Sequence, residues 1–232
     1  MPARRLSDQP SQLDPYDVLG QTDGSTDLML HALLCNESTP RADVSKTTTV
    51  NCMHMGPPLG RRTDCGDAVG SAGLAEGHRR KIKTFVDDRR QERKAAKKRL
   101  QAAGRGDALR FEYCIHPAAT KPSGEFPLWR FSCVGFVLEA YRAARIRLLG
   151  SPRPSVSVSK LKQLYPDSAD ELDDPSVCDR MGIGEGESWS VALVGYLLNS
   201  LARDTDEIHR TPYVPRVGDE YFPSQAQDTT LG

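Results

Sequence analysis

The run Trp129-Arg-Phe-Ser-Cys-Val-Gly-Phe-Val-Leu-Glu-Ala-Tyr141 gives the clearest local prediction in this chain of 232 residues. Its apolar side chains recur at the three- and four-residue spacing of a helix that buries one face. The pattern continues to Leu149 and stops at Gly150, which predicts a helix over residues 132–149. Cys133 would lie in the first turn, where free backbone N–H groups and the positive end of the helix dipole stabilise a thiolate. Cys133 is therefore the first candidate nucleophile.

The residues around Cys133 suit attack on a carbonyl carbon. Backbone N–H groups of the same turn could also donate to an oxyanion, because Gly135 leaves the approach open. The competing interpretation is structural, since buried free cysteine is one of the commonest core residues.

The segment Ser132-Cys-Val-Gly-Phe-Val137 resembles the cysteine motif of the NlpC/P60 superfamily of papain-like hydrolases, Asp-Cys-Ser-Gly-Phe-Val. Ser132 and Val134 stand where that motif has Asp and Ser. The resemblance implies an α+β fold of the papain-like NlpC/P60 type, with a small antiparallel sheet packed on the Cys133 helix. It further implies a thiol-dependent hydrolase or acyltransferase that acts on an amide or ester bond of a small-molecule or peptide substrate. No cofactor and no metal are implied.

A thiol hydrolase pairs its cysteine with a histidine, and the chain has five. His31 is the first candidate, because circularly permuted members of the superfamily place a histidine strand before the cysteine helix. The segment Leu30-His-Ala-Leu-Leu-Cys-Asn36 resembles their His-Val-Gly-Ile-Tyr strand. His116, at the end of the strand predicted before the motif, is the second candidate. His209 has the ordinary family order but lies in a polar segment with little strand character, and the third catalytic residue stays unassigned.

The alternative function is a non-catalytic binding or scaffold protein with the same fold. Residues 76–103 predict a basic helix with a narrow apolar stripe, and eleven Lys or Arg lie between Arg79 and Arg99. Such a helix could contact an anionic partner through residues 79–99. Nucleic acid is not favoured, because the net charge of the chain is zero and the sequence places no aromatic platform beside the helix.

The polar, proline-containing residues 1–26 predict a disordered leader, residues 27–223 a single α+β domain and residues 224–232 a disordered tail. No apolar run has the length of a spanning helix, and the start of the chain lacks the apolar core of a secretory signal. These features predict a cytoplasmic protein with free thiols, and they leave the oligomeric state open. The spacing of Cys52, His54, Cys65 and His78 does not match the close pairs of structural zinc sites.

Overall fold

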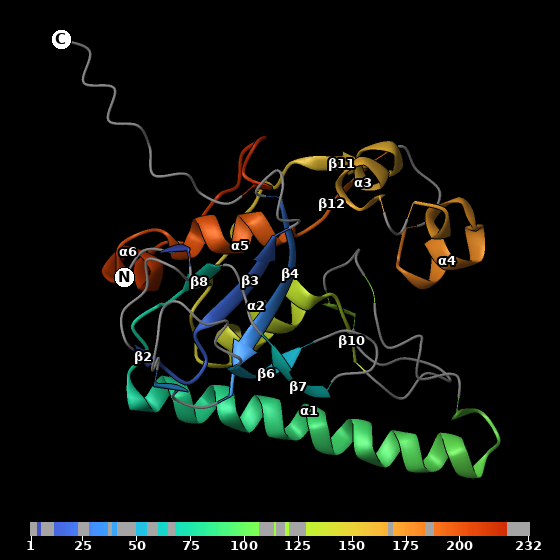
Figure 1. Ribbon diagram of the computed structural model, residues 1–232, viewed down its shortest axis with the longest axis horizontal. Helices are drawn as coiled ribbons and strands as arrows, with labels where there is room; N and C mark the ends of the chain where they lie inside the picture. The colour runs from blue at the N-terminus through green and yellow to red at the C-terminus, as the bar shows by residue number, and fades with distance from the viewer. Residues whose placement is uncertain are drawn as a thin grey trace.

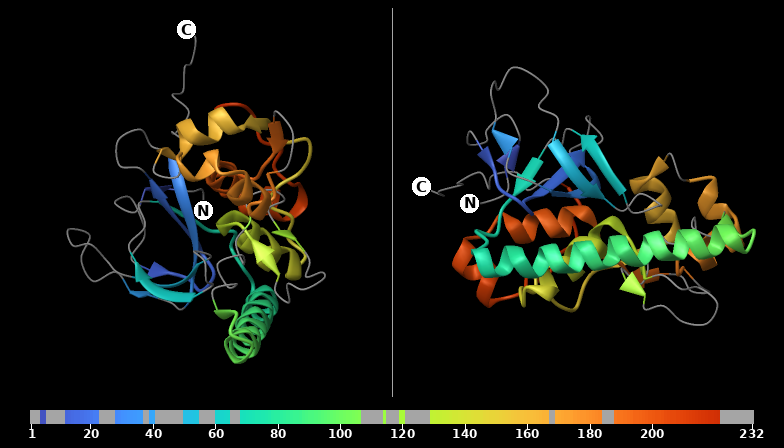
Figure 2. Two further views of the ribbon diagram at one scale, coloured as in Figure 1. Left: turned by 90° about the vertical axis from the view of Figure 1, so that its right-hand side faces the viewer. Right: turned by 90° about the horizontal axis from the view of Figure 1, so that it is seen from below.

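The computed structural model describes residues 4–5, 12–22, 28–36, 39–40, 50–54, 60–64, 68–106, 114, 119–120, 129–166, 169–183 and 188–221. An antiparallel sheet of six strands in the order β1-β8-β3-β4-β6-β7 lies at its centre (Figure 1). These strands are β1 (Arg4–Arg5), β3 (Val18–Thr22), β4 (Met29–Cys35), β6 (Val50–His54), β7 (Gly60–Asp64) and β8 (Ala68–Gly70). The helices gather on one side of the sheet, with α1 (Glu76–Ala102) along an edge of the molecule (Figure 2). The predicted α+β class with a small antiparallel sheet is confirmed.

Smaller elements complete the architecture. Three two-stranded pairs join β2 (Gln12–Leu13) to β5 (Thr39–Pro40), β9 (Ala119–Thr120) to β10 (Arg130–Phe131), and β11 (Ser155–Ser157) to β12 (Ser188–Ser190). The remaining helices are α2 (Cys133–Ala143), α3 (Val158–Leu164), the 3-10 helix η4 (Glu171–Asp173), α4 (Pro175–Arg180), α5 (Val194–Leu201) and α6 (Thr205–Arg210).

Strand β4 separates two apolar layers, because successive side chains of a strand point to opposite faces. Ala32 and Leu34 join the main core, which includes the buried face of α2. Leu33 and Cys35 join a smaller cluster with Leu19 and residues of neighbouring strands. The predicted strand therefore forms, and α2 covers only one of its faces.

Helix α2 begins where the sequence predicts and ends earlier. The Ser132 hydroxyl caps it by accepting a hydrogen bond from the Gly135 N–H at 2.8 Å. The helix stops at Ala143, because the chain turns at Arg145, whose φ is 67°. Ile146 and Leu148, assigned by periodicity to the helix, are buried from a non-helical segment instead.

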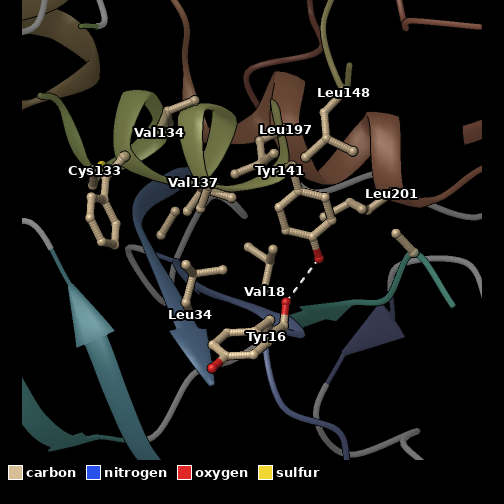
Figure 3. Close-up of a cluster of buried hydrophobic side chains, with 14 of the residues drawn as sticks. Tyr16, Val18, Leu34, Cys133, Val134, Val137, Tyr141, Leu148, Leu197 and Leu201 are labelled. Carbon is tan, nitrogen blue, oxygen red and sulfur yellow. Dashed lines mark hydrogen bonds between the residues drawn. The ribbon is translucent and has the colours of Figure 1, made fainter. Parts of the chain in front are cut away.

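A buried tyrosine ties α2 to the turn before β3. The Tyr141 hydroxyl donates to the backbone carbonyl of Tyr16 at 2.8 Å, from within a cluster of apolar side chains (Figure 3). The structure thus differs from the expected leader at residues 12–22, where Val18 and Leu19 are fully buried. Val18 and Leu19 are only two apolar residues within a mostly polar segment, so composition alone does not predict a strand there. Pairing with β4 brings them into the core. The predicted tail, residues 224–232, lies outside the described residues.

Helix α5 occupies only part of the apolar run from Ser188 to Arg203, whose composition predicts a helix over its whole length. Ser188–Ser190 pairs with β11, and the helix begins only at Val194. Gly195 then lets the backbone of Glu220 approach so closely that any Cβ would clash with it. Asn199 fixes the same segment by donating to the carbonyl of Asp219 at 3.0 Å.

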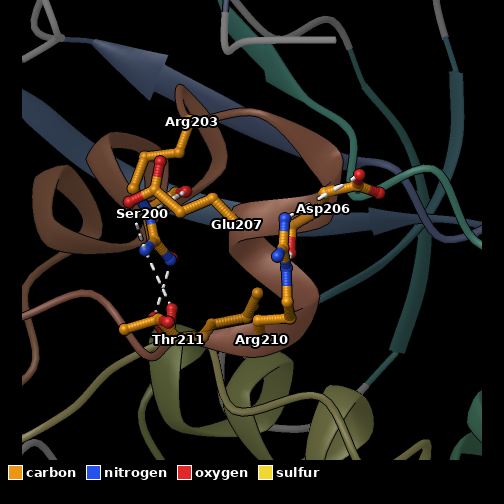
Figure 4. A network of polar contacts seen from close by, with 7 residues as sticks. Ser200, Arg203, Asp206, Glu207, Arg210 and Thr211 are labelled. Atoms are coloured by element: carbon orange, nitrogen blue, oxygen red, sulfur yellow. Dashed lines mark hydrogen bonds and ion pairs between the residues drawn. The ribbon is translucent and has the colours of Figure 1, made fainter.

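Arg203 joins α5 to α6 and to the segment that follows. Its guanidinium donates to the Thr211 carbonyl at 2.8 Å and pairs with Glu207 at 3.2 Å, while its Nε donates to the Ser200 carbonyl at 3.1 Å (Figure 4). These contacts hold α5, α6 and the segment after α6 together.

Candidate functional site

Cys133 is the first residue of α2, as the sequence predicts, but little of it reaches solvent. It is 6% exposed and belongs to the main apolar core (Figure 3). Val134 and Val137 of the same helix are buried beside it. The thiol lies at the N-terminal end of the helix, beside the Ala32 backbone of β4.

The surroundings of the sulfur favour the neutral thiol. Burial is the largest effect and raises the pKa of Cys133, while backbone groups of Ala32, Val134 and Cys133 itself lower it. Among the described residues, no histidine is one of the groups that shift this pKa. A raised pKa favours the neutral thiol over the nucleophilic thiolate in this conformation.

Tyr165 is the ionisable side chain that shares its electrostatic environment with Cys133. Burial chiefly raises the pKa of Tyr165, and Cys133, Tyr196 and Glu220 raise it further. Glu220 is itself buried and pairs with Lys160 at 3.3 Å. The Tyr165 phenol is therefore a polar neighbour of the thiol, and its raised pKa keeps it protonated over the physiological range.

His31 lies on β4, the strand that packs against the Cys133 helix, and the backbone of the next residue, Ala32, is a hydrogen-bonding neighbour of the Cys133 sulfur. His31 pairs with Gln21 across the strands, and the pleat puts it on the face shared by Leu33 and Cys35, opposite to α2. His116, the second candidate, lies outside the described residues. The motif predicted the place of the cysteine on its helix, whereas the face of β4 that carries His31 depends on strand register, which the motif does not contain.

His209 lies elsewhere, in α6. Its Nε2 is 2.7 Å from the Ala72 carbonyl oxygen, and its ring packs edge-on against His78 with centroids 5.2 Å apart. Within the described residues no cluster of three His, Cys, Asp or Glu could hold a metal ion. The side chains of Cys52, His54 and Cys65 lie outside those residues.

Helix α1 presents a different kind of surface. Its buried residues are Ile82, Val86, Ala96 and Leu100, which form the narrow stripe that the sequence predicts. In the first two thirds, ion pairs join Lys83 to Asp87 at 2.6 Å and Arg89 to Glu92 at 2.6 Å. After Glu92 no acidic residue follows up to Gly106. All charged residues in the last third of α1 are therefore basic.

Four basic side chains of this last third are exposed, and none has an ion-pair partner among the described residues. They are Lys94, Lys97, Lys98 and Arg99. Lys97 and Lys98 follow Lys94 by three and four residues, so the three lysines are neighbours on one side of the helix, and Arg99 extends this positive strip beside Lys98.

An open pocket of about 420 Å³ adjoins α1, and no local sequence pattern indicates it. It is lined by Phe85, Arg89, Trp129, Glu139, Arg142 and Ala143. The Arg89 guanidinium carbon lies 5.7 Å from the centre of the Phe85 ring and 5.9 Å from that of Trp129. Trp129 is far from the basic run in sequence, so only folding places an aromatic side chain beside it.

Comparison with protein-family models, with curated proteins and with solved structures gives no match for this chain. None of the helices in the described part of the chain combines the length and the apolar character needed to cross a membrane.

Proposed function

We propose that this protein is a non-catalytic binding protein that holds a polyanionic partner along α1. The observation that carries the proposal is the strip of exposed, unpaired Lys94, Lys97, Lys98 and Arg99. Charges without intramolecular partners are available to an external anion, and their binding releases condensed counterions from it.

The charge balance of α1 supports this proposal. The helix has eleven Lys or Arg and four Asp or Glu, so it carries seven more basic than acidic residues. A helix of 27 residues extends over about 40 Å, which allows contact with several successive anionic groups of a polymer. Its apolar residues are turned inward, so the exposed face offers electrostatic contact and not insertion into an apolar phase.

The test is the salt dependence of binding to two chemically different polyanions, heparin and inorganic polyphosphate. We expect the wild-type protein to bind both at low salt. The combined change Lys94→Glu, Lys97→Glu and Lys98→Glu should abolish this binding. Each lost contact with a phosphate polymer lowers the slope of log K against log salt by about 0.7 to 0.9, so three contacts lower it by about 2 to 3.

The matched control replaces the same three lysines by arginine, which keeps the charge at every position. This variant should bind like the wild type. Absence of binding by the wild type at low salt, or equal binding by the glutamate variant, would contradict the proposed function.

A second candidate function is the thiol-dependent hydrolase or acyltransferase of the papain-like, NlpC/P60 type that the motif resembles. It is favoured by the position of Cys133 at the capped start of α2, where backbone groups of Ala32 and Val134 oppose the effect of burial on the pKa of the thiol. In this function Cys133 would lose its proton to a base and attack the acyl carbon, the amine or alcohol would leave with a proton, and water or a second acceptor would then take the acyl group from the sulfur. The sulfur must first become accessible to substrate.

Thiol labelling under native conditions separates the two functions. Cys178 is half-buried in the short helix α4 and serves as the internal reference for the rate of thiol labelling. The binding function predicts that a maleimide labels Cys178 before Cys133 at neutral pH, with Cys133→Ala leaving the fast phase unchanged. Faster labelling at Cys133, lost in Cys133→Ala and retained in Cys178→Ala, would favour the hydrolase instead.

A further inference from the structure

The pocket beside α1 combines aromatic rings with guanidinium groups. Trp129 is half-buried and stacks on Phe131 with an interplanar angle of 10° and ring centres 5.7 Å apart. Phe85 comes from α1 and lies at the same pocket, with Arg89 over its ring. The volume of about 420 Å³ falls within the range of about 300 to 1,000 Å³ that small-ligand pockets occupy.

The α2 wall of the pocket holds one guanidinium in a fixed orientation. Arg142 donates to the Glu139 carboxylate through its Nε at 2.8 Å and lies 2.6 Å from the same oxygen through a second nitrogen. Its side chain is nevertheless 63% exposed. Because Glu139 holds the edge of the planar Arg142 guanidinium, the flat face of this cation is available for stacking with a ring that enters from solvent.

The α1 wall is similarly organised around a cation. Arg89 pairs with Glu92 at 2.6 Å, while its Nε is buried without a hydrogen-bond partner. The backbone of Trp129 contacts Glu92 as well, so the aromatic segment is attached directly to the basic helix. The pocket and the basic strip are thus carried by the same helix. Lys94 follows Arg89 by five residues, about 7.5 Å along the helix axis, and lies on another side of the helix, so a ligand that contacts both must pass around α1.

We propose that the pocket takes a nucleobase of a single-stranded nucleic acid whose phosphates follow the basic strip of α1. The inference rests on the proposed function, since it names the polyanion that α1 holds. Single-strand readers combine a positive track for the backbone with flat side chains on which bases stack, and both parts are present here. The base lies against Arg142 and the Trp129–Phe85 wall, and the phosphates contact Lys94, Lys97 and Lys98.

Other polyanions use only half of this surface. A sulfated or phosphorylated polymer without bases contacts the lysines and leaves the pocket empty. A duplex keeps its bases stacked inside the helix, out of reach of the pocket. An anionic membrane gains nothing from the pocket, because the apolar residues of α1 are turned inward.

The test compares a labelled single strand with the same strand built from abasic nucleotides, by fluorescence anisotropy on the full chain. RNA and DNA versions form two arms that share the stacking chemistry. We expect the base-bearing strand of at least one to bind about tenfold more tightly than its abasic version. A duplex and phosphatidylserine vesicles should show no such gain over the abasic strand.

Variants assign the gain to the pocket. Arg142→Ala removes an exposed side chain and should make the affinities for the base-bearing and the abasic strand about equal. The slope of log K against log salt should stay unchanged. In a Trp189→Phe background Trp129 is the only tryptophan, and its fluorescence should be quenched by the base-bearing strand but not by the abasic one. The matched control is Arg145→Ala. Arg145 is an exposed arginine three residues after Arg142 and does not line the pocket, so this variant should keep the preference for the base-bearing strand.

Failure of this inference is distinguishable from failure of the proposed function. Equal affinity for base-bearing and abasic strands, with binding still lost in the triple glutamate variant, overturns the nucleobase pocket and leaves polyanion binding intact. Vesicles bound more tightly than any single strand overturn it as well. Loss of binding to every polyanion tested overturns both.

Discussion

The surroundings of Cys133 and the edge formed by α1 with Trp129 differ in how well a local sequence pattern predicts which side chains are exposed to solvent. The first has a recognisable motif, yet its thiol is 6% exposed and carries a raised pKa. The second has no motif, only a run of charges, yet it presents exposed cations and a pocket. A motif fixes the place of a residue on its helix, whereas exposure depends on distant segments such as the one that carries Tyr165. High charge density predicts exposure more directly, because unpaired charges are rarely buried.

The largest expected effect tests whether the two regions share one core. Phe136 of α2 is 1% exposed and contacts Phe85 of α1 and Phe131 of β10, with ring centres 5.7 Å apart in both pairs. Phe136→Ala should lower the free energy of unfolding by about 3 to 5 kcal/mol, since it leaves a cavity between the helices. Urea denaturation measures this loss.

Phe136→Leu is the matched control and should cost less, because it keeps most of the buried volume. A loss of less than about 1 kcal/mol for Phe136→Ala would mean that α1 is not anchored through this ring. The comparison would then be between two independent parts of the molecule.

A smaller effect concerns the start of the Cys133 helix. Ser132→Ala removes the acceptor for the Gly135 N–H and should destabilise the protein by about 1 kcal/mol. Ser132→Gly should cost at least as much, because Ser132 is 2% exposed and water does not replace the lost acceptor. If alanine causes no measurable loss in urea denaturation, the hydroxyl is not an effective cap and the helix start is less well fixed than the motif suggests.

The pH dependence of stability sharpens the comparison at the first turn of α1. Burial chiefly lowers the pKa of His78, and the neighbouring His209 and Lys81 lower it further. The unfolded chain, with a histidine pKa of about 6.5, then binds protons before the folded chain does. Stability contributed by neutral His78 is present above about pH 6.5 and is lost as the pH falls through its lower folded pKa.

Urea denaturation at a series of pH values should show this decrease, and His78→Gln should reduce its slope. An unchanged slope in the variant would assign the decrease to other groups. His209→Gln is the companion variant, because it removes the neighbouring ring that contributes to the shift.

The smallest effect on stability is expected on the basic strip. The three exposed lysines changed together to glutamate should alter the free energy of unfolding by no more than about 0.5 kcal/mol each, as surface substitutions usually do. The same variant is expected to lose polyanion binding. A large loss of stability would mean that the strip supports the fold, and the contrast with the Cys133 region would then fail.

Periodicity in sequence predicted those elements that are regular over their whole length. The basic helix, predicted over residues 76–103, spans Glu76–Ala102, and β4 forms over Met29–Cys35, which overlaps the strand-like segment Leu30–Asn36. Elements were misjudged where apolar residues are buried without a regular period. Ser188–Ser190 looks helical beside the apolar run of α5 but forms a strand, because it pairs with Ser155–Ser157.

The candidate sites depended on tertiary contacts that no local pattern contains. The helix start at Cys133 followed from its spacing, but its burial did not. The face of β4 that carries His31 is set by pairing with β3, as the register of Gln21 with His31 shows. The approach of Trp129 to Arg89 requires α1 and α2 to pack together, and it supplies the aromatic partner whose apparent absence had disfavoured nucleic acid.

The charge of α1 has a consequence before any contact is made. The chain as a whole is neutral, so the rest of it has seven more acidic than basic residues, opposite to the excess on the helix. The positive excess is thus concentrated along the edge of the molecule that α1 forms. Within a screening length of about 10 Å at 0.1 M salt, a polyanion rotates that edge toward itself and repels the remaining surface. Productive orientation is therefore selected during the encounter, and it weakens as salt is added.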